Sequence, residues 1–242
     1  MKFLRSITLL FFTILFFSLE VYAQNDQLYD GSLIRGSKNN IFVYMNGKAV
    51  WIPNEKIFNM LNLDWNSVIK IQDEKLKEIS RGWLFLSGGD QSVYIYSYGK
   101  IRKIINMKLF DGLGFNRKEI LIAPEDKLKS ISEGPLLVKG SGDFVYLIVN
   151  EKACWIESDK IFNMLGFDSK TVVRIGDYNL DKLPKAPLLI RGTEEKIYKI
   201  ENNQRMWISN PDIFDRLGYD WNTIYYVDDN ILNNIPEGSP IR

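Results

Sequence analysis

The sequence contains no histidine and only one cysteine, Cys154. Histidine is the commonest general base in enzymes and a frequent metal ligand, so its absence excludes a Ser-His-Asp or Cys-His catalytic site. One thiol cannot close a disulfide within the chain, so we expect the fold to be stable through its core alone. We expect Cys154 to be a small buried hydrophobic residue, and an intermolecular disulfide is the alternative.

The sequence also lacks the motifs that usually hold phosphates and metal ions. It has no glycine-rich phosphate loop, no calcium loop of the D-x-D-x-D-G type and no cluster of metal ligands. Paired carboxylates would still permit glycoside hydrolysis. The acidic residues recur with the repeat described below, however, whereas an active site usually breaks such symmetry. We therefore predict a protein that is not an enzyme and needs no cofactor or metal.

There is no excess of charge of either sign. The whole chain has a formal net charge of +1, and without its first 23 residues it has 29 basic and 29 acidic residues. A neutral protein has no electrostatic reason to bind nucleic acid or an anionic membrane. The hydrophobic content of 45% is ordinary for a globular protein and argues against disorder.

No apolar run is long enough for a membrane span, which needs ~20 residues. The longest, residues 7–19, has thirteen. Lys2 and Arg5 precede it, and residues 21–23 form a cleavage site of the small-x-small kind. We expect a signal peptide over residues 1–23, with an uncleaved anchor as the alternative. The protein is then secreted, periplasmic or on the cell surface, without membrane contact after cleavage.

What the sequence does contain is one unit repeated four times without an insertion. Equivalent residues lie 52 positions apart. The columns include Gly36, Gly88, Gly140 and Gly192, then Phe58, Phe110, Phe162 and Phe214, and then Leu61, Leu113, Leu165 and Leu217. We divide the chain into the signal peptide, a linker over 24–30 and one repeat domain over 31–242. Its units span 31–82, 83–134, 135–186 and 187–238.

Each unit is expected to have the order β-β-β-α-β, followed by a turn of helix. A short apolar strand ends at the repeated glycine, whose simplest explanation is a positive φ. A hairpin follows, and in unit one Asn46-Gly47 is a strong signal for a type I′ turn. The next helix starts after an N-cap column and ends at an αL column. These columns are Asn54, Asn106, Ser158 and Asn210, and Asn62, Gly114, Gly166 and Gly218.

A unit of this size cannot bury its phenylalanine alone, so the units must pack against one another. Two arrangements fit a mainly β chain with short helices. The first is a closed ring resembling a four-bladed β-propeller, and the second is an open array. Equal repeat lengths and terminal units that deviate no more than the second favour the ring. Residues 238–242 look like the start of a fifth unit and argue against closure. We expect the ring, with the open array as the alternative.

The core of the repeat motif is best seen in unit three. It stands there as residues 137–140, 145–150, 155–156 and 161–168. This motif resembles a repeat of uncharacterised secreted or cell-surface bacterial proteins, some of which also carry hydrolase or wall-associated domains. The resemblance covers the whole mature chain and implies no catalytic residue. The architecture, though not the motif, is similar to hemopexin-type four-bladed propellers.

Two columns provide candidate binding residues. The first contains Trp51, Trp155 and Trp207, with Lys103 in the second unit. If exposed, these indoles would stack on sugar rings; if buried, they would fill the interfaces between units. The lysine indicates a partly exposed column, because a core position rarely accepts that side chain.

The second column is basic and contains Arg35, Lys139 and Arg191, with Ser87 in the second unit. In a ring these side chains would converge on an anion or an acidic ligand. Alternatively they pair with local carboxylates at the surface, which stabilises little.

We therefore expect a secreted, non-catalytic binding module. Its ligand is expected to be cell-wall glycan or another polysaccharide, contacted by both columns. The alternative is a protein-binding or structural component of the cell surface.

Overall fold

The computed structural model describes residues 27–88 and 92–242. The signal peptide expected over residues 1–23 lies outside these ranges. Within them, no helix is both long and apolar enough to cross a membrane. The described chain forms four separate mixed sheets, one in each unit, with short helices between the strands.

The elements follow the same order in every unit. Unit one contains β1 (Leu33–Arg35), β2 (Ile41–Met45), β3 (Lys48–Ile52), α1 (Glu55–Met60), η1 (Trp65–Ser67), β4 (Ile69–Lys70), α2 (Asp73–Glu78) and β5 (Ser80–Gly82). Unit two contains β6 (Leu84–Ser87), β7 (Val93–Ser97), β8 (Lys100–Ile104), α3 (Met107–Gly112), η2 (Arg117–Glu119), β9 (Ile120–Ile122) and α4 (Glu125–Lys129). Unit three contains β10 (Leu137–Lys139), β11 (Val145–Val149), β12 (Lys152–Ile156), α5 (Asp159–Met164), η3 (Ser169–Thr171), β13 (Val173–Arg174), α6 (Asp177–Lys182) and β14 (Lys185–Ala186). Unit four contains β15 (Leu189–Arg191), β16 (Tyr198–Glu201), β17 (Gln204–Trp207), α7 (Pro211–Arg216), η4 (Trp221–Thr223), β18 (Ile224–Tyr226) and α8 (Asp229–Asn234).

The strand pairing is also shared by the units. In unit one the order is β4-β1-β2-β3-β5, with β1, β2 and β3 antiparallel and the two outer strands parallel to their neighbours. In units two and four the fifth strand shrinks to one bridge, Ile101 with Glu133 and Arg205 with Glu237. The segment that leaves each unit therefore pairs with that unit's own hairpin.

The expected start and stop signals operate as local chemistry predicts. Both hairpin residues Asn46 and Gly47 have positive φ, as a type I′ turn requires. The Asn54 side chain accepts a hydrogen bond from the N–H of Ile57, and α1 is followed by Asn62 at φ 51°. The equivalent N-cap and αL residues do the same in the other three units.

The repeated glycine has a different cause from the one expected. Gly140 does not have a positive φ; instead, a Cβ there would collide with the carboxylate of Asp177. That carboxylate accepts hydrogen bonds from the N–H of Ser141 at 2.7 Å and from its hydroxyl at 2.6 Å. Units one and four repeat this contact. The glycine is therefore needed for a close approach between the strand end and the last helix.

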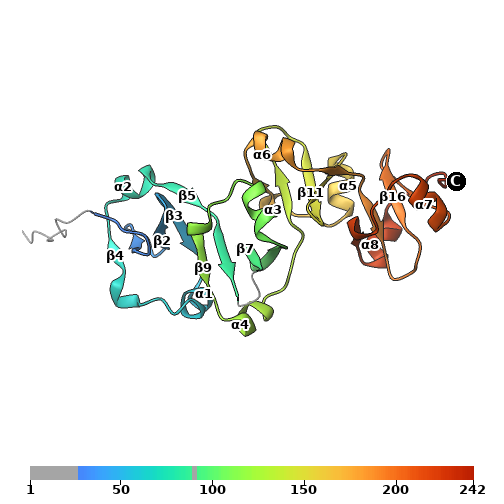
Figure 1. Cartoon of the computed structure of the whole chain (residues 1–242). Coiled ribbons are helices and arrows are strands. Elements are labelled where there is room, and N and C mark those ends of the chain that lie inside the picture. The colour runs from blue at the N-terminus through green and yellow to red at the C-terminus, as the bar shows by residue number, and fades with distance from the viewer. Residues whose placement is uncertain (1–26, 89–91) are drawn as a thin grey trace, which may run out of the picture.

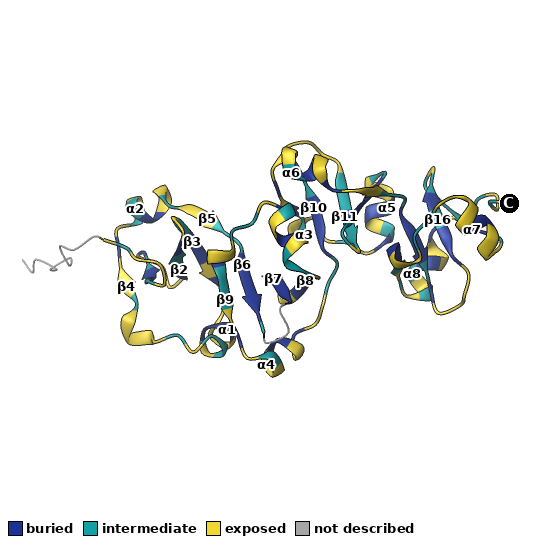
Figure 2. Cartoon of the chain, in the orientation of Figure 1, coloured by how far each residue is buried: buried dark blue, intermediate teal, exposed yellow. Residues whose placement is uncertain are grey.

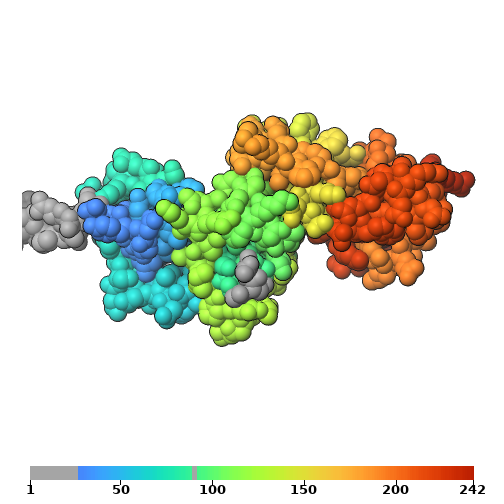
Figure 3. Space-filling view, in the orientation of Figure 1, coloured from blue at the N-terminus to red at the C-terminus, as the bar shows by residue number. Residues whose placement is uncertain are grey.

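The four units form an open row and not a ring. In Figures 1 and 3 they succeed one another from the N-terminal to the C-terminal end, with the first and fourth at opposite ends. Phe58 lies in a cluster shared by units one and two, Phe110 in one shared by two and three, and Phe162 in one shared by three and four. Phe214 lies in a cluster built from the last unit and its tail. The ring expected above is therefore not observed in the described chain, which adopts the alternative arrangement.

The two faces of each sheet explain the row. In units two and three, one face is covered by the unit's own first helix and the following unit, and the other face by its own last helix and the preceding unit. Unit one lacks the contact with a preceding unit, and unit four lacks the contact with a following unit. Figure 2 shows the result, with buried strands inside and exposed helix surfaces outside. Cys154 is fully buried between units three and four, and burial raises the pKa of its thiol to about 12.

The last unit carries polar residues where the others pack against a successor. Lys199 and Glu201 pair at 2.8 Å on this terminal face. The position of Lys199 is occupied by Val43, Ile95 and Leu147 in the other units, and the position of Glu201 by Met45, Ser97 and Val149. The tail residue Ile241 donates its N–H to the carbonyl of Trp207 at 2.8 Å and packs into the terminal cluster. A polar outer face of this kind is typical of a capping repeat.

Candidate functional site

The strongest candidate for a ligand site is a pocket in the last unit, which we call the unit-four pocket. It has a volume of about 400 Å³ and lies beside α7, near the C-terminal end of the row. Arg191, Glu195, Trp207, Asn210 and Trp221 contribute its polar and aromatic side chains, and buried Phe214 also lines it. The pocket thus combines two indoles with a guanidinium, a carboxylate and an amide.

Local structure fixes each of these side chains. Arg191 ends β15 and Trp207 ends β17, so both stand where the sheet meets the loop into α7. Asn210 is the N-cap of α7, and its side-chain oxygen accepts a hydrogen bond from the N–H of Ile213 at 3.0 Å. Trp221 is the first residue of η4 and follows the αL turn that ends α7. The site is therefore built on rigid element ends.

Trp221 is held firmly although it is 46% exposed. Its ring packs on buried Phe214 with centroids 4.1 Å apart and an interplanar angle of 31°. Its indole N–H donates to the carboxylate of Asp215 at 2.8 Å. Trp207 is half-buried, with the ammonium of Lys196 5.8 Å from its ring centroid. The two indoles present apolar surface at fixed positions.

Arg191 supplies hydrogen-bond donors. Its guanidinium lies 5.3 Å from the ring centroid of Tyr226, and its Nε is buried without a hydrogen-bond partner in the described structure. A buried donor without a partner costs free energy. The carboxylate of Glu195 provides an acceptor in the same pocket.

Unit three contains an equivalent but more polar pocket, which we call the unit-three pocket. Its volume is about 870 Å³. Lys139 and Asp143 occupy the positions of Arg191 and Glu195, and they lie 3.7 Å apart as an ion pair. Ser169 stands where unit four has its exposed tryptophan. A pocket therefore recurs at the same place in units three and four, and the residues that line it differ.

The structure brings some of the expected binding residues together and separates others. Arg191 and Trp207 share the unit-four pocket, and Lys139 lies in the unit-three pocket. The other four expected binding residues do not line either of these two pockets. Trp51, Trp155 and Lys103 are exposed, and Arg35 is half-buried. Because the row is open, the basic side chains of different units do not converge on one point.

Trp221, Asn210 and Glu195 were not among the expected binding residues. The signal for Trp221 was its pairing with Trp65 at the same repeat position. Asn210 was recognised only as a helix cap, and nothing in the sequence marked Glu195. Within residues 27–88 and 92–242, no group of three histidine, cysteine, aspartate or glutamate side chains could hold a metal ion.

Comparisons with known proteins identify no family. No family model matches the chain, and no curated protein matches it. The chain is similar to one in the periplasmic assembly from the ESX-5 inner membrane complex, with 12% identity, 91% of this chain and 71% of that chain covered, and a TM-score of 0.21. A second similarity, to an intact ESX-5 inner membrane complex, has 10% identity, coverage of 89% and 53%, and the same TM-score. At this TM-score neither similarity carries information on function.

Proposed function

We propose that the protein is an exported, non-catalytic module that binds cell-wall glycan or another polysaccharide through the unit-four pocket. The observation that carries this proposal is that Trp207, Trp221 and Arg191 line one pocket. A pyranose ring has an apolar face of C–H groups and a rim of hydroxyls. Fixed indole faces match the former, and the guanidinium, amide and carboxylate match the latter.

The size of the pocket supports this ligand class. Its volume of about 400 Å³ lies within the range of roughly 300–1,000 Å³ typical of small-ligand sites. Covering ~100 Å² of exposed indole surface would contribute about 2.5 kcal/mol to binding. That is a modest affinity for one sugar, so a polymer bound at several places on the row would be held more tightly.

Export is part of the proposal and rests on the N-terminal sequence. A signal peptide over residues 1–23 would deliver the protein to the compartment that contains wall polysaccharides. The neutral charge of the remaining chain suits a neutral ligand better than a polyanion.

The test is retention of the purified protein on insoluble peptidoglycan, cellulose, chitin and α-glucan, followed by titration with soluble fragments of any polymer that retains it. Trp221→Ala should reduce retention at least about tenfold, because it removes an indole from the pocket. Trp65→Ala is the matched control, because Trp65 stacks on Phe58 at 3.8 Å in unit one and lies outside the unit-four pocket.

Equal retention of the two variants, or no retention on any polymer, would refute the proposal. If wall material retains the protein only before protease treatment, the ligand is a protein. That result would favour the protein-binding alternative.

A further inference from the structure

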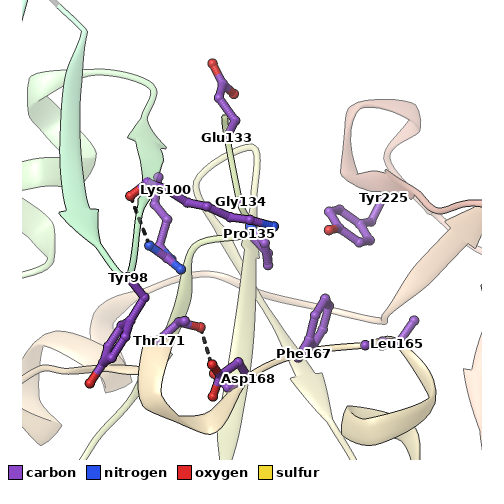
Figure 4. Close-up of a pocket in the computed structure, with 12 residues that line it drawn as sticks. Tyr98, Lys100, Glu133, Gly134, Pro135, Leu165, Phe167, Asp168, Thr171 and Tyr225 are labelled. Atoms are coloured by element: carbon purple, nitrogen blue, oxygen red, sulfur yellow. Dashed lines mark hydrogen bonds between the residues drawn. The ribbon is translucent and has the colours of Figure 1, made fainter. Parts of the chain in front are cut away.

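A third pocket lies where units two, three and four meet, and we call it the junction pocket. Its volume is about 530 Å³. Lys100 and Arg102 come from unit two, Phe167 and Asp168 from unit three, and Tyr225 from unit four. Figure 4 shows Lys100, Phe167, Asp168 and Tyr225 around one space. The pocket shares none of its lining residues with the unit-four pocket.

Comparison of the three junctions shows why this one is open. Between units one and two, Lys48 forms an ion pair with buried Glu119 at 2.7 Å. Between units three and four, Lys152 forms one with Asp220 at 2.9 Å. Lys100 is the equivalent lysine of unit two, but among the described residues it forms no ion pair. The polar contact that closes the other two junctions is therefore missing at the middle one.

Arg102 is the most unusual side chain at this junction. It is 2% exposed and is the largest fully buried side chain of the described chain, yet its repeat equivalents are Val50, Cys154 and Met206. One terminal nitrogen donates to the carbonyl and hydroxyl of Ser97 at 2.9 and 2.7 Å. Its Nε has no hydrogen-bond partner, and no described carboxylate forms an ion pair with it.

A buried guanidinium without a counter-ion is costly, and an anion that enters the pocket would offset that cost. Burial lowers the pKa of Arg102, and the more distant carboxylate of Asp168 opposes the shift. Lys100 adds a second cation on the pocket wall, so the pocket has a place for a carboxylate beside two positive groups.

The rest of the lining selects among carboxylates. Asp168 provides an acceptor for hydroxyl groups, and Phe167 provides an apolar surface. Burial raises the pKa of Tyr225, and its phenol hydroxyl is a further donor. A ligand that uses all these groups has one carboxylate, several hydroxyls and an apolar ring face.

We propose that the junction pocket binds a sugar acid, with the carboxylate between Arg102 and Lys100 and the hydroxyls toward Asp168. This site is separate from the unit-four pocket, so the proposal does not depend on glycan binding there. It assigns the middle junction a ligand where the other two junctions have an internal ion pair.

The test is titration of the purified protein with D-galacturonate, followed by NMR of backbone amides and arginine Nε–H groups. D-galactose lacks the carboxylate, and acetate lacks the ring and hydroxyls. Galacturonate should shift the Nε–H resonance of Arg102 and bind at least about tenfold more tightly than either. Equal binding of galactose or acetate would overturn the proposal.

Variants guided by the repeat complete the test. Arg102→Met introduces the residue that unit four carries at this position, so the fold should persist, and galacturonate affinity should fall about tenfold or more. Lys118→Met removes an exposed charge of unit two outside the pocket and should leave affinity unchanged. Trp221→Ala should also leave it unchanged, which separates this site from the unit-four pocket. Undiminished binding by Arg102→Met, or loss with Trp221→Ala alone, would refute the assignment.

Discussion

The open row makes a prediction about the repeated phenylalanines that a ring does not make. Phe110 lies between units two and three, is fully buried, and has its ring 5.0 Å from Phe85 and 5.5 Å from Phe115. Phe214 is 1% exposed, but its core cluster contains only residues of unit four and the C-terminal tail, whereas the cluster of Phe110 joins units two and three. In a row the interior site couples two units, whereas the terminal site affects the last unit only.

The magnitude follows from the buried area. A phenylalanine side chain that buries about 160 Å² contributes about 4 kcal/mol, within the range of about 3–5 kcal/mol measured for phenylalanine-to-alanine changes in cores. Phe110→Ala should lose this amount from the interface that holds the middle of the row together. Phe214→Ala should lose a comparable amount, but unit four alone should open.

Hydrogen exchange followed by mass spectrometry resolves the units. Phe110→Ala should increase exchange across residues 83–186, while Phe214→Ala should increase it only across 187–238. A ring would place unit four against unit one, so Phe214→Ala would then also expose residues 31–82. Increased exchange in unit one of the Phe214→Ala variant would refute the open row.

Three further predictions concern the end of the row, the acidic column and the thiol. Replacing both Lys199 and Glu201 with valine should make the terminal face apolar and cause concentration-dependent self-association, measured by light scattering. If the double variant remains a strict monomer, the ion pair does not prevent association of the terminal face. Hydrogen bonds from Thr193 and Ser141 hold the pKa values of Asp229 and Asp177 below the ordinary 3.8. These two hydrogen-bonded carboxylates therefore contribute stability above pH 3.8, and this contribution is lost as the pH falls through their lowered pKa values. The double change to asparagine should flatten the acid limb of the thermal midpoint plotted against pH, and an unchanged limb would contradict this. Cys154, with its pKa at about 12, should react with a thiol reagent only when the protein unfolds, and rapid labelling of the native protein would contradict its burial.

Local chemistry determined much of the structure inside each unit, and the sequence predicted the first four strands and the two helices. It did not predict the 3-10 helix or the outermost parallel strand. Asn46-Gly47, the N-cap Asn54 and the αL residue Asn62 act through neighbours a few positions away, so a single sequence contains the information. The repeated glycine was less transparent. Its partner, the aspartate of the last helix, lies 37 residues further along the chain, and no local rule connects the two.

The arrangement of the units was not predictable from repeat length. Equal units can close a ring or extend a row, because length does not decide whether the last face is covered. The informative signal was the chemistry of Lys199 and Glu201 within columns that are mostly apolar elsewhere. A lysine in such a column cannot pack against a further unit at low cost, so it indicates an end. Inspection of columns by sheet face would have favoured the row.

In the candidate sites, the repeated fold sets the position of each pocket, and residues that differ between units set its chemistry. The repeat supplies a hollow beside the first helix in units three and four, and residues outside the repeat consensus decide its chemistry. Trp221 makes one hollow aromatic, while Ser169 leaves its equivalent polar.

Residues that differ from their equivalents in the other units are therefore the best guide to the position of a binding site. Unit two carries a buried arginine, Arg102, at a position that is apolar in the other three units. Its guanidinium donates hydrogen bonds to Ser97 but forms no ion pair among the described residues. The other units show that the fold is satisfied without that charge, and its desolvation opposes folding. An anion in the junction pocket would offset that desolvation cost. If Arg102→Met proves more stable than the parent protein and loses only galacturonate binding, the two effects will have been separated in one variant.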